Sequence, residues 1–331
     1  MFRSRTRILA PPLAIALIAL AGCGGLTVNA ASTSPNGLEK TTLNVAVVPA
    51  VDSAGFFVAL HEGLFKERGL TVNYTPAISS DDVINQMVSG QYDITGGNYV
   101  SYIQHYVTKH QPLEIIAEGS VMQEGTQAIY TMPHSKITTI SRLKGHLLGI
   151  NAPFNINYLL AASVLTENGI RLPQVRFPAK PIPFPIMAQQ LAAGKIDAAA
   201  LPEPFATSAE QKYGAVVLTD LNQGATVQFP IQGYVTTRSW AARNPHTLSA
   251  FIAAISQGQE IADTSRPAVE RAMESLSGPQ NGQITPIVAS VMAINIYPTA
   301  INKTRIQRVA DVMLQFGLLN SRFLVAPMIG P

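Results

Sequence analysis

Cysteine is almost absent from this chain of 331 residues, because Cys23 is its only one. A single cysteine excludes intrachain disulfides, zinc sites built from cysteine clusters and iron–sulfur sites. Charged residues are also scarce, at 13%, whereas hydrophobic residues make up 47%. This apolar content excludes a disordered chain, and the length predicts about two domains.

The small excess of positive charge lies at the N-terminus. The chain has 23 Lys and Arg against 20 Asp and Glu, and Arg3, Arg5 and Arg7 all precede the first acid, Glu39. Without these three arginines the two signs are equal in number. We therefore expect no basic surface and no nucleic-acid partner.

The first residues match an export signal. The apolar run Ile8–Leu20 follows the arginines and is broken by Pro11-Pro12, and the small residues Ala21 and Gly22 precede Cys23. This pattern is typical of a secretory signal, and the run is too short to span a bilayer. Leu-Ala-Gly-Cys resembles the bacterial lipobox, which implies acylation of Cys23 and anchoring to the outer face of the cell membrane. The alternative is a plain signal peptide in which the cysteine falls there by chance.

The rest of the chain alternates strand-like and helix-like segments. Leu43–Val48, Thr71–Tyr74 and Tyr92–Thr95 read as strands separated by amphipathic segments, which predicts an α/β fold with a largely parallel sheet. Four helices are expected near the C-terminus: Pro245–Ala262, Pro267–Leu276, Ile284–Ile294 and Lys303–Phe316. The predicted organisation is a signal peptide (1–22), a lipid-anchored tether (23–40), a first lobe (41–130), a second lobe (131–230) and a return to the first lobe (231–331).

Two patterns recur in the same order about a hundred residues apart. Glu67-Arg68-Gly69-Leu70 corresponds to Glu167-Asn168-Gly169-Ile170. Met87–Ile94 corresponds to Leu191–Ala198, and in both segments a helix ends at glycine and an Asp opens the next strand. The recurrence predicts two lobes of similar design, because its period is too long for a solenoid repeat.

Polar and aromatic side chains follow the predicted strands. Ligands of open α/β sheets bind beyond the carboxyl ends of the strands, so these segments supply the candidate ligand-binding residues. They are Asp52, Ser53, Phe56, Asn98, Tyr99, Ser120, Asn151, Phe154, Asn155, Glu203, Gln232 and Tyr234.

Several blocks of sequence together resemble one family. They are FFVALHEGLFKERGLTV, MVSGQYDITGGN, LKGHLLGIN, LAAGKIDAAALPEPFA and VTTRSWAARNPHTLSAFIAAI, and they follow the lipobox. The chain resembles the periplasmic-binding-protein-like solute receptors of nitrate/sulfonate/taurine and thiamine-precursor ABC importers. The resemblance implies a two-lobe type II fold, with the ligand held in a cleft between lobes joined by crossovers near Tyr130–Ser135 and Gln228–Tyr234. It also implies lobe closure, an ABC permease as partner and a family Glu-Pro step at Glu203-Pro204.

The strand ends favour an organic solute. They carry the acids Asp52, Glu118 and Glu203 and no Lys or Arg. Carboxylates accept N–H bonds and aromatic rings stack on planar solutes, so we expect an aminopyrimidine-like or a sulfonate- or taurine-like ligand. The six histidines are scattered, and the sequence has no dinucleotide, phosphate-loop or serine-hydrolase motif, so we expect no metal, no cofactor and no catalytic residue.

Structural roles compete with each of these assignments. Asp52, Asn155 and Glu203 are also plausible helix caps, Phe154 and Tyr99 are plausible core residues, and Glu118 is expected to face solvent. At the level of function, the alternatives to a monomeric binding protein are an enzyme of the same fold, acting on a pyrimidine precursor or small organic acid, and an adhesive surface lipoprotein.

Overall fold

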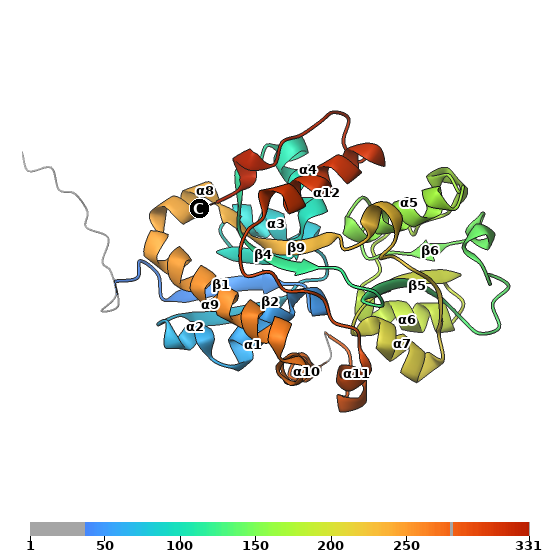
Figure 1. Cartoon of the computed structure of the whole chain (residues 1–331), viewed down its shortest axis with the longest axis horizontal. Helices are drawn as coiled ribbons and strands as arrows, with labels where there is room; N and C mark the ends of the chain where they lie inside the picture. Colours follow the sequence, from blue (N-terminus) through green and yellow to red (C-terminus); the bar gives the residue numbers. More distant parts are fainter. Residues whose placement is uncertain (1–36, 279–280, 331) are drawn as a thin grey trace, which may run out of the picture. The chain divides into compact units, whose positions relative to one another are not determined.

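The computed structural model describes residues 37–278 and 281–330 (Figure 1). The expected signal peptide, Cys23 and most of the expected tether lie outside this part. None of the helices within it is long and apolar enough to cross a membrane.

The first sheet has five strands in the order β2-β1-β3-β9-β4 (Figure 1). They are β1 (Thr42–Val47), β2 (Thr71–Pro76), β3 (Ile94–Asn98), β4 (Leu113–Val121) and β9 (Pro230–Thr237). β1 pairs in parallel with β2 and β3, whereas β9 runs antiparallel to both β3 and β4. The second sheet has the order β6-β7-β5-β8. Its strands are β5 (Gln127–Thr131), β6 (Leu148–Gly149), β7 (Ala198–Pro202) and β8 (Val216–Asp220).

The expectation of a largely parallel sheet was wrong. In the second sheet only β6 and β7 are parallel, and β5 is antiparallel to both β7 and β8. β5 and β9 are the first strands after the chain crosses from one sheet to the other. Both are antiparallel to their neighbours, so each sheet contains parallel and antiparallel pairs. The α/β class itself is confirmed.

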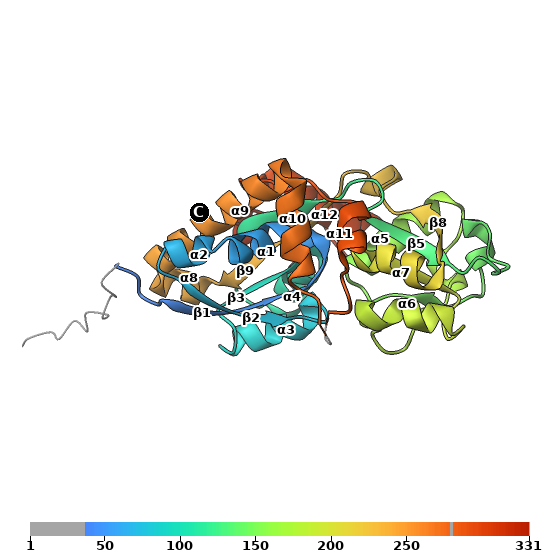
Figure 2. The same ribbon diagram turned by 90° about the horizontal axis from the view of Figure 1, so that it is seen from below.

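Helices cover both faces of the first sheet. α1 (Ala54–His61), α9 (Pro245–Thr264) and α10 (Arg266–Glu274) lie on one face, and α3 (Ser80–Val88) lies on the other (Figure 2). Alternate residues of β9 explain this arrangement: Tyr234 is buried in the same core as Phe56 of α1 and Phe251 of α9, whereas Val235 shares a core with α3, α4 (Tyr99–Lys109) and α12 (Lys303–Gln315).

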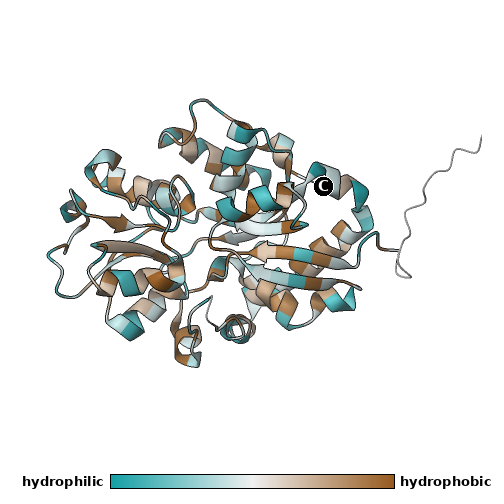
Figure 3. Cartoon of the chain, turned by 180° about the vertical axis from the view of Figure 1, so that it is seen from behind, coloured by the Kyte–Doolittle hydropathy of each residue, from teal (hydrophilic) through white to brown (hydrophobic). Residues whose placement is uncertain are grey.

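The second sheet is covered in the same way. Ala198 and Ala200 of β7 belong to the core of α5 (Ile156–Glu167), whereas Ala199 and Leu201 pack with α6 (Phe184–Ala192) and α7 (Phe205–Tyr213). Apolar and polar residues alternate along many of the covering helices (Figure 3), as expected for helices with one buried face. The shorter helices are α2 (Leu64–Glu67), α8 (Arg238–Arg243) and α11 (Pro286–Val291).

One of the two repeated sequence patterns, the Asp that opens a strand, has the same structural role in each sheet. Asp93 precedes β3 and accepts a 2.8 Å hydrogen bond at Oδ2 from the backbone N–H of Asn44. Asp197 precedes β7 and accepts a 2.7 Å bond at Oδ2 from the N–H of Leu147. The predicted correspondence between the two lobes is therefore confirmed at the level of one repeated hydrogen bond.

Three segments link the two sheets. The chain crosses from β4 to β5 over residues 122–126 and from β8 to β9 over residues 221–229. The first crossing precedes the expected Tyr130–Ser135 segment, because Gln127–Thr131 already pairs with β7. The third link, residues 293–297, is here named the strap. Its Ala293 N–H lies 3.4 Å from Glu203 Oε1, and its Ile296 forms an antiparallel bridge with Val121.

The residues next to β1 are bound to the body of the protein. Glu39 accepts a 2.9 Å hydrogen bond from the N–H of Thr247 in the first turn of α9, and its carboxylate lies 2.6 Å from His246 Nδ1. Lys40 Nζ lies 2.6 Å from Asp93 Oδ1. The chain is thus tied to α9 and β3 before β1 begins.

Candidate functional site

A small polar cavity lies between the strand ends of the two sheets. Its volume is about 30 Å³, which is room for one or two water molecules. Both sheets and their following helices supply its lining. The polar lining side chains are Asp52, Ser80, Asn98, Gln127, Asn151, Asn157 and Gln232.

Asp52 is the one titratable residue of this lining among the described residues. It lies in a short 3-10 turn (Val51–Ser53), next to Ser53, the N-cap residue of α1, whose side chain makes no cap bond. Asn295 Nδ2 of the strap donates to its Oδ1 over 2.7 Å. Burial raises the pKa of Asp52 to about 6, and the hydrogen bonds from Asn295 and Gln127 oppose that increase.

Two asparagines cap helices next to the cavity, and one of them, Asn98, also lines it. Asn98 caps α4, since its Oδ1 accepts from the N–H of Ser101 over 2.8 Å, and its Nδ2 donates to Ser80 Oγ. Asn155 caps α5 through the N–H of Tyr158, and its Nδ2 donates to Asn151 Oδ1 over 2.8 Å. Asn155 therefore positions Asn151, which lines the cavity. Asn98 and Asn155 occupy equivalent places in the two lobes, because each residue follows a strand and precedes a helix.

Gln232 enters the cavity from β9. Its Oε1 lies 3.0 Å from the hydroxyl of Ser53, which also donates to the carbonyl of Val48. Ser53 thus orients Gln232 without lining the cavity itself. Asp52, Asn98, Asn151 and Gln232 are the predicted residues that the structure brings together here, with Ser53 and Asn155 behind them.

The predicted aromatic residues do not line the cavity. Phe56, Tyr99 and Tyr234 are fully buried in the cores beside the first sheet, where large rings gain most from packing. Phe154 is 56% exposed and packs on Tyr158, with ring centroids 5.2 Å apart. Ser120 is buried at the end of β4.

Glu203 lies behind the cavity wall. Its carboxylate accepts from the N–H of Thr207 over 3.0 Å and from Thr207 Oγ1 over 2.7 Å, at the start of α7. Its own carbonyl accepts a 2.9 Å bond from Val51 N–H, which joins the two lobes directly. Burial raises the pKa of Glu203 to about 7, against the hydrogen bonds from Thr207 and Ala293.

The expectation that Glu118 faces solvent was wrong. Its side chain is 1% exposed and forms an ion pair with Arg305, with Nε 2.8 Å from Oε2. The pairing joins β4 to α12 across 187 positions, so no local pattern signals it. Burial raises the pKa of Glu118, and Arg305 opposes that increase.

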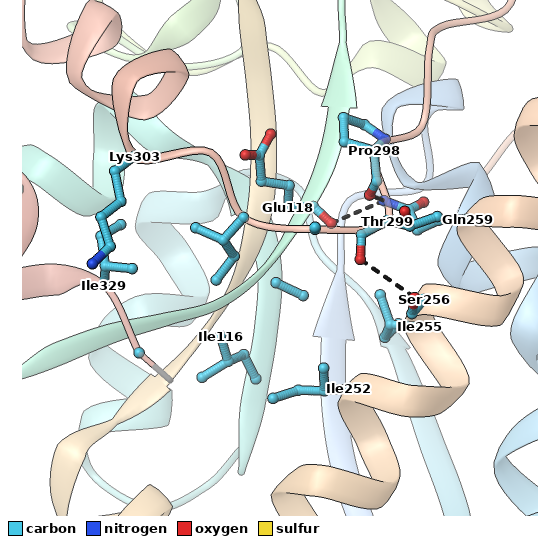
Figure 4. Close-up of a pocket in the computed structure, with 14 residues that line it drawn as sticks. Ile116, Glu118, Ile252, Ile255, Ser256, Gln259, Pro298, Thr299, Lys303 and Ile329 are labelled. Atoms are coloured by element: carbon cyan, nitrogen blue, oxygen red, sulfur yellow. Dashed lines mark hydrogen bonds between the residues drawn. The ribbon is translucent and has the colours of Figure 1, made fainter.

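A larger hollow of about 460 Å³ lies beside Glu118, between β4, α9 and the segment after the strap (Figure 4). Its wall carries Ile116, Ile252 and Ile255, and Gln259 donates to the carbonyls of Glu118 and Gly119. All of these residues lie in the first sheet or in the helices and loops packed on it. The polar cavity, which both sheets line, is therefore the candidate functional site.

Sequence reasoning missed three polar lining residues. Gln127 begins β5 and donates a hydrogen bond to Asp52, which is distant in the sequence, so no local pattern marks it. Asn157 lies in the first turn of α5, where the local signal was assigned to Asn155. Ser80 begins α3, next to its N-cap Ser79, and a serine at a helix start reads from the sequence as a cap and not as a lining residue. Within the described residues, no group of three or more His, Cys, Asp or Glu could hold a metal ion.

A comparison with known protein families shows which family this chain belongs to. The family described as NMT1/THI5 like matches residues 50–266, which include every strand of the two sheets except β1 and most of the cavity lining. The chain belongs to the NMT1/THI5-like family.

Solved structures share the fold of this NMT1/THI5-like chain. The alkanesulfonate-binding protein SsuA from Xanthomonas axonopodis, bound to MOPS, has a TM-score of 0.72 and 16% identity, covering 88% of this chain and 98% of that one. The periplasmic nitrate-binding protein NrtA from Synechocystis has a TM-score of 0.71 and 13% identity, covering 86% and 83%. The two-lobe periplasmic-binding fold is thereby confirmed.

Curated relatives of the chain are longer proteins. The bicarbonate transport ATP-binding protein CmpC from Synechocystis is 25% identical over 237 residues, which is 66% of this chain and 35% of that protein. The nitrate import ATP-binding protein NrtC from the same organism is 25% identical over 260 residues, covering 73% and 38%. The chain thus spans little more than a third of the length of the curated relatives it matches.

Proposed function

We propose that this chain is the solute-binding lipoprotein of an ABC importer. It captures a small organic solute that contains nitrogen or sulfur between its two lobes and delivers it to a membrane permease. The observation that carries the proposal is the polar cavity, since asparagine and glutamine side chains from the strand ends of both sheets converge on it with Asp52. The names of the similar structures and relatives, which refer to sulfonate, nitrate and bicarbonate, support this class of function.

The chemistry of the cavity favours binding over catalysis. Its described lining offers one carboxylate and a set of amides and a hydroxyl, which can donate and accept hydrogen bonds. Acid–base catalysis on a small molecule commonly uses a pair of groups with different protonation states. Such a pair is not present in this lining, and Glu203 directs its carboxylate at α7 instead.

Capture requires the lobes to move. A cavity of about 30 Å³ is smaller than a typical solute site of about 300 Å³ or more, so a solute enters when the lobes part. The crossings at residues 122–126 and 221–229 are the proposed hinges. Solute that contacts both lobes then shifts the population toward the closed state.

Export and anchoring complete the proposal. Cys23, in its lipobox-like context, is the proposed acylation site, and the following residues are the proposed tether between the membrane and the body. Labelling cells with a palmitate analogue tests this step. The chain should carry the label and the Cys23→Ser variant should not, and an equal label on both would remove the lipoprotein assignment.

The decisive experiment is identification of the solute. The full chain is purified in detergent without added ligand, denatured, and the released small molecules are read by mass spectrometry. One stoichiometric organic solute is expected, and deletion of the gene should abolish uptake of that solute by the source cells. Normal uptake of the released solute after deletion would contradict the importer role.

A further inference from the structure

An apolar groove lies beside the polar cavity, between the two lobes. Its volume is about 400 Å³, which falls within the range of a small-molecule site. Val48 and Phe184 line both the groove and the polar cavity, so the two spaces are adjacent. A ligand that reaches past these two side chains would occupy both spaces.

The groove walls are unsuited to a polar ligand. Four of the twelve lining residues are prolines, which have no backbone N–H to donate: Pro49, Pro76, Pro183 and Pro185. Ile78 from the first lobe and Ile186 from the second are 52% and 42% exposed. Exposed aliphatic side chains on both walls gain free energy when an apolar group covers them.

The polar cavity has the opposite chemistry, and its charge has one sign. Among the described residues that line the cavity and the groove, none is Lys, Arg or His, and Asp52 is the one acid. The side chain of Asn157 lines the cavity, its residue is 1% exposed, and its Oδ1 accepts no hydrogen bond from the described residues. The same lining also holds an unpaired buried donor, Gln232 Nε2. A ligand that donates hydrogen bonds satisfies the two acceptors, Asp52 and Asn157 Oδ1, and a lone pair of the ligand can accept from Gln232.

We infer that the solute is an amphiphilic amine. Its small nitrogen head group donates to Asp52 and Asn157 in the polar cavity, and its apolar body lies in the groove between Ile78 and Ile186. This inference rests on the proposed function and defines its ligand. It separates this chain from an anion receptor, because a nitrate, bicarbonate or sulfonate head would face Asp52 with no cation to balance its charge.

The size of the cavity fits this head group. A space of about 30 Å³ admits a group about as large as one or two water molecules, such as an ammonium. Burial raises the pKa of Asp52 to about 6, because ionising a buried carboxyl group costs free energy. A cationic nitrogen within hydrogen-bond distance offsets this cost. The head group and the carboxylate then stabilise each other's charge.

Calorimetry on the full chain in detergent tests the inference with three probes: ethylamine, hexylamine and hexane-1-sulfonate. Each of the four added methylenes contributes about a fourfold gain in affinity, so hexylamine should bind roughly 200-fold more tightly than ethylamine. Hexane-1-sulfonate should not bind measurably. Before the titration the protein is unfolded and refolded to remove any solute that co-purified with it.

Variants separate the two halves of the site. Ile186→Ser should weaken hexylamine by about tenfold and leave ethylamine unchanged, because it alters only the groove wall. Asp52→Asn should weaken both amines by at least about tenfold, since a charge-assisted bond is lost. Ile287→Ser is the matched control, because Ile287 is 64% exposed on α11 and outside the groove.

Three results would overturn the inference. Tighter binding of hexane-1-sulfonate than of hexylamine would contradict the amine head, equal binding of the two amines would contradict the groove, and no binding of any probe would contradict both parts. None of these results bears on the importer role itself, which is tested by the solute that co-purifies. An inorganic or sulfonate anion released from the protein would remove the amine inference and leave the importer role intact.

Discussion

Asn295 Nδ2 donates a 2.7 Å hydrogen bond to Asp52 Oδ1, across 243 positions of the chain. Through this contact the strap holds the carboxylate that lines the polar cavity. The same strap places the N–H of Ala293 against Glu203. Both acids are buried, and burial raises both pKa values, so a single segment contacts the two most strongly perturbed carboxyl groups near the cavity.

Asp52→Asn is expected to raise stability at neutral pH. The folded-state pKa of about 6 lies above that of an exposed aspartate, so the folded state retains its proton where the unfolded state has lost it. Stability is therefore full below about pH 4 and falls as the pH rises to about 6, by up to about 3 kcal/mol. Urea unfolding from pH 4 to 8 should show a smaller fall for Asp52→Asn than for the wild type. The exposed Asp311→Asn on α12 is the control, and an equal pH dependence in all three proteins would contradict the argument.

The raised pKa of Glu203 predicts a second loss of stability with pH, at a slightly higher pH than that of Asp52. Its folded-state pKa of about 7 means that stability is lost as the pH rises from about 4.5 to about 7. Glu203→Gln should flatten this window, whereas Glu203→Ala also removes the acceptor for the N–H of Thr207 and should cost about 1 kcal/mol at pH 5. Thermal unfolding at pH 5 and pH 8 distinguishes the variants. Equal thermal stability of Glu203→Gln and Glu203→Ala at pH 5 would contradict the prediction.

Arg305→Ala is expected to destabilise the first lobe strongly. It leaves the Glu118 carboxylate buried without its partner, and loss of one member of a buried pair costs about 3–5 kcal/mol. Replacing both residues by methionine should recover most of that loss, because no buried charge then remains. Lys303→Ala, on the exposed side of the same helix turn, is the control for a charge change alone. A double variant no more stable than Arg305→Ala would contradict the charge explanation.

Glu39 predicts a loss of stability in acid. Burial alone would raise its pKa, but hydrogen bonds from the backbone of Thr247, from its own backbone and from His246 lower it to about 2. The stabilisation is thus present above about pH 4.5 and is lost as the pH falls through about 2. Glu39→Gln should lower the unfolding midpoint at pH 7 by the equivalent of about 1 kcal/mol, with little effect at pH 2. A shift of equal size at both pH values would show that the charge of Glu39 is unimportant.

Local patterns in the sequence predicted the features that depend on neighbouring residues. The alternation of strands and helices, the two matched Asp residues at 93 and 197, and the cap Asn155 all follow from short-range rules. Strand direction did not follow, because it depends on where β5 and β9 pair after crossing between lobes.

The same limit applies to the site. Asp52 and Asn151 were found because each follows a strand, and the end of a strand is a place that the sequence marks. The partners of Asp52, namely Gln127 and Asn295, are 75 and 243 positions away and lie in segments with no polar motif of their own. The aromatic residues were assigned to the ligand because a ring beside a strand end suits either a solute or the core, and only the packing of the helices distinguishes the two.

The contacts of Glu39 and Lys40 also have a mechanical consequence. A protein anchored through a segment before residue 37 experiences force along that segment whenever it engages a partner in the membrane. The bonds to His246, Thr247 and Asp93 lie ahead of β1, so they receive this load first and pass it to the long helix α9. If the chain is anchored as proposed, strand β1, from whose end Asp52 and the polar cavity follow, would be shielded from tension, and the proposed solute site would keep its geometry while the anchor is pulled.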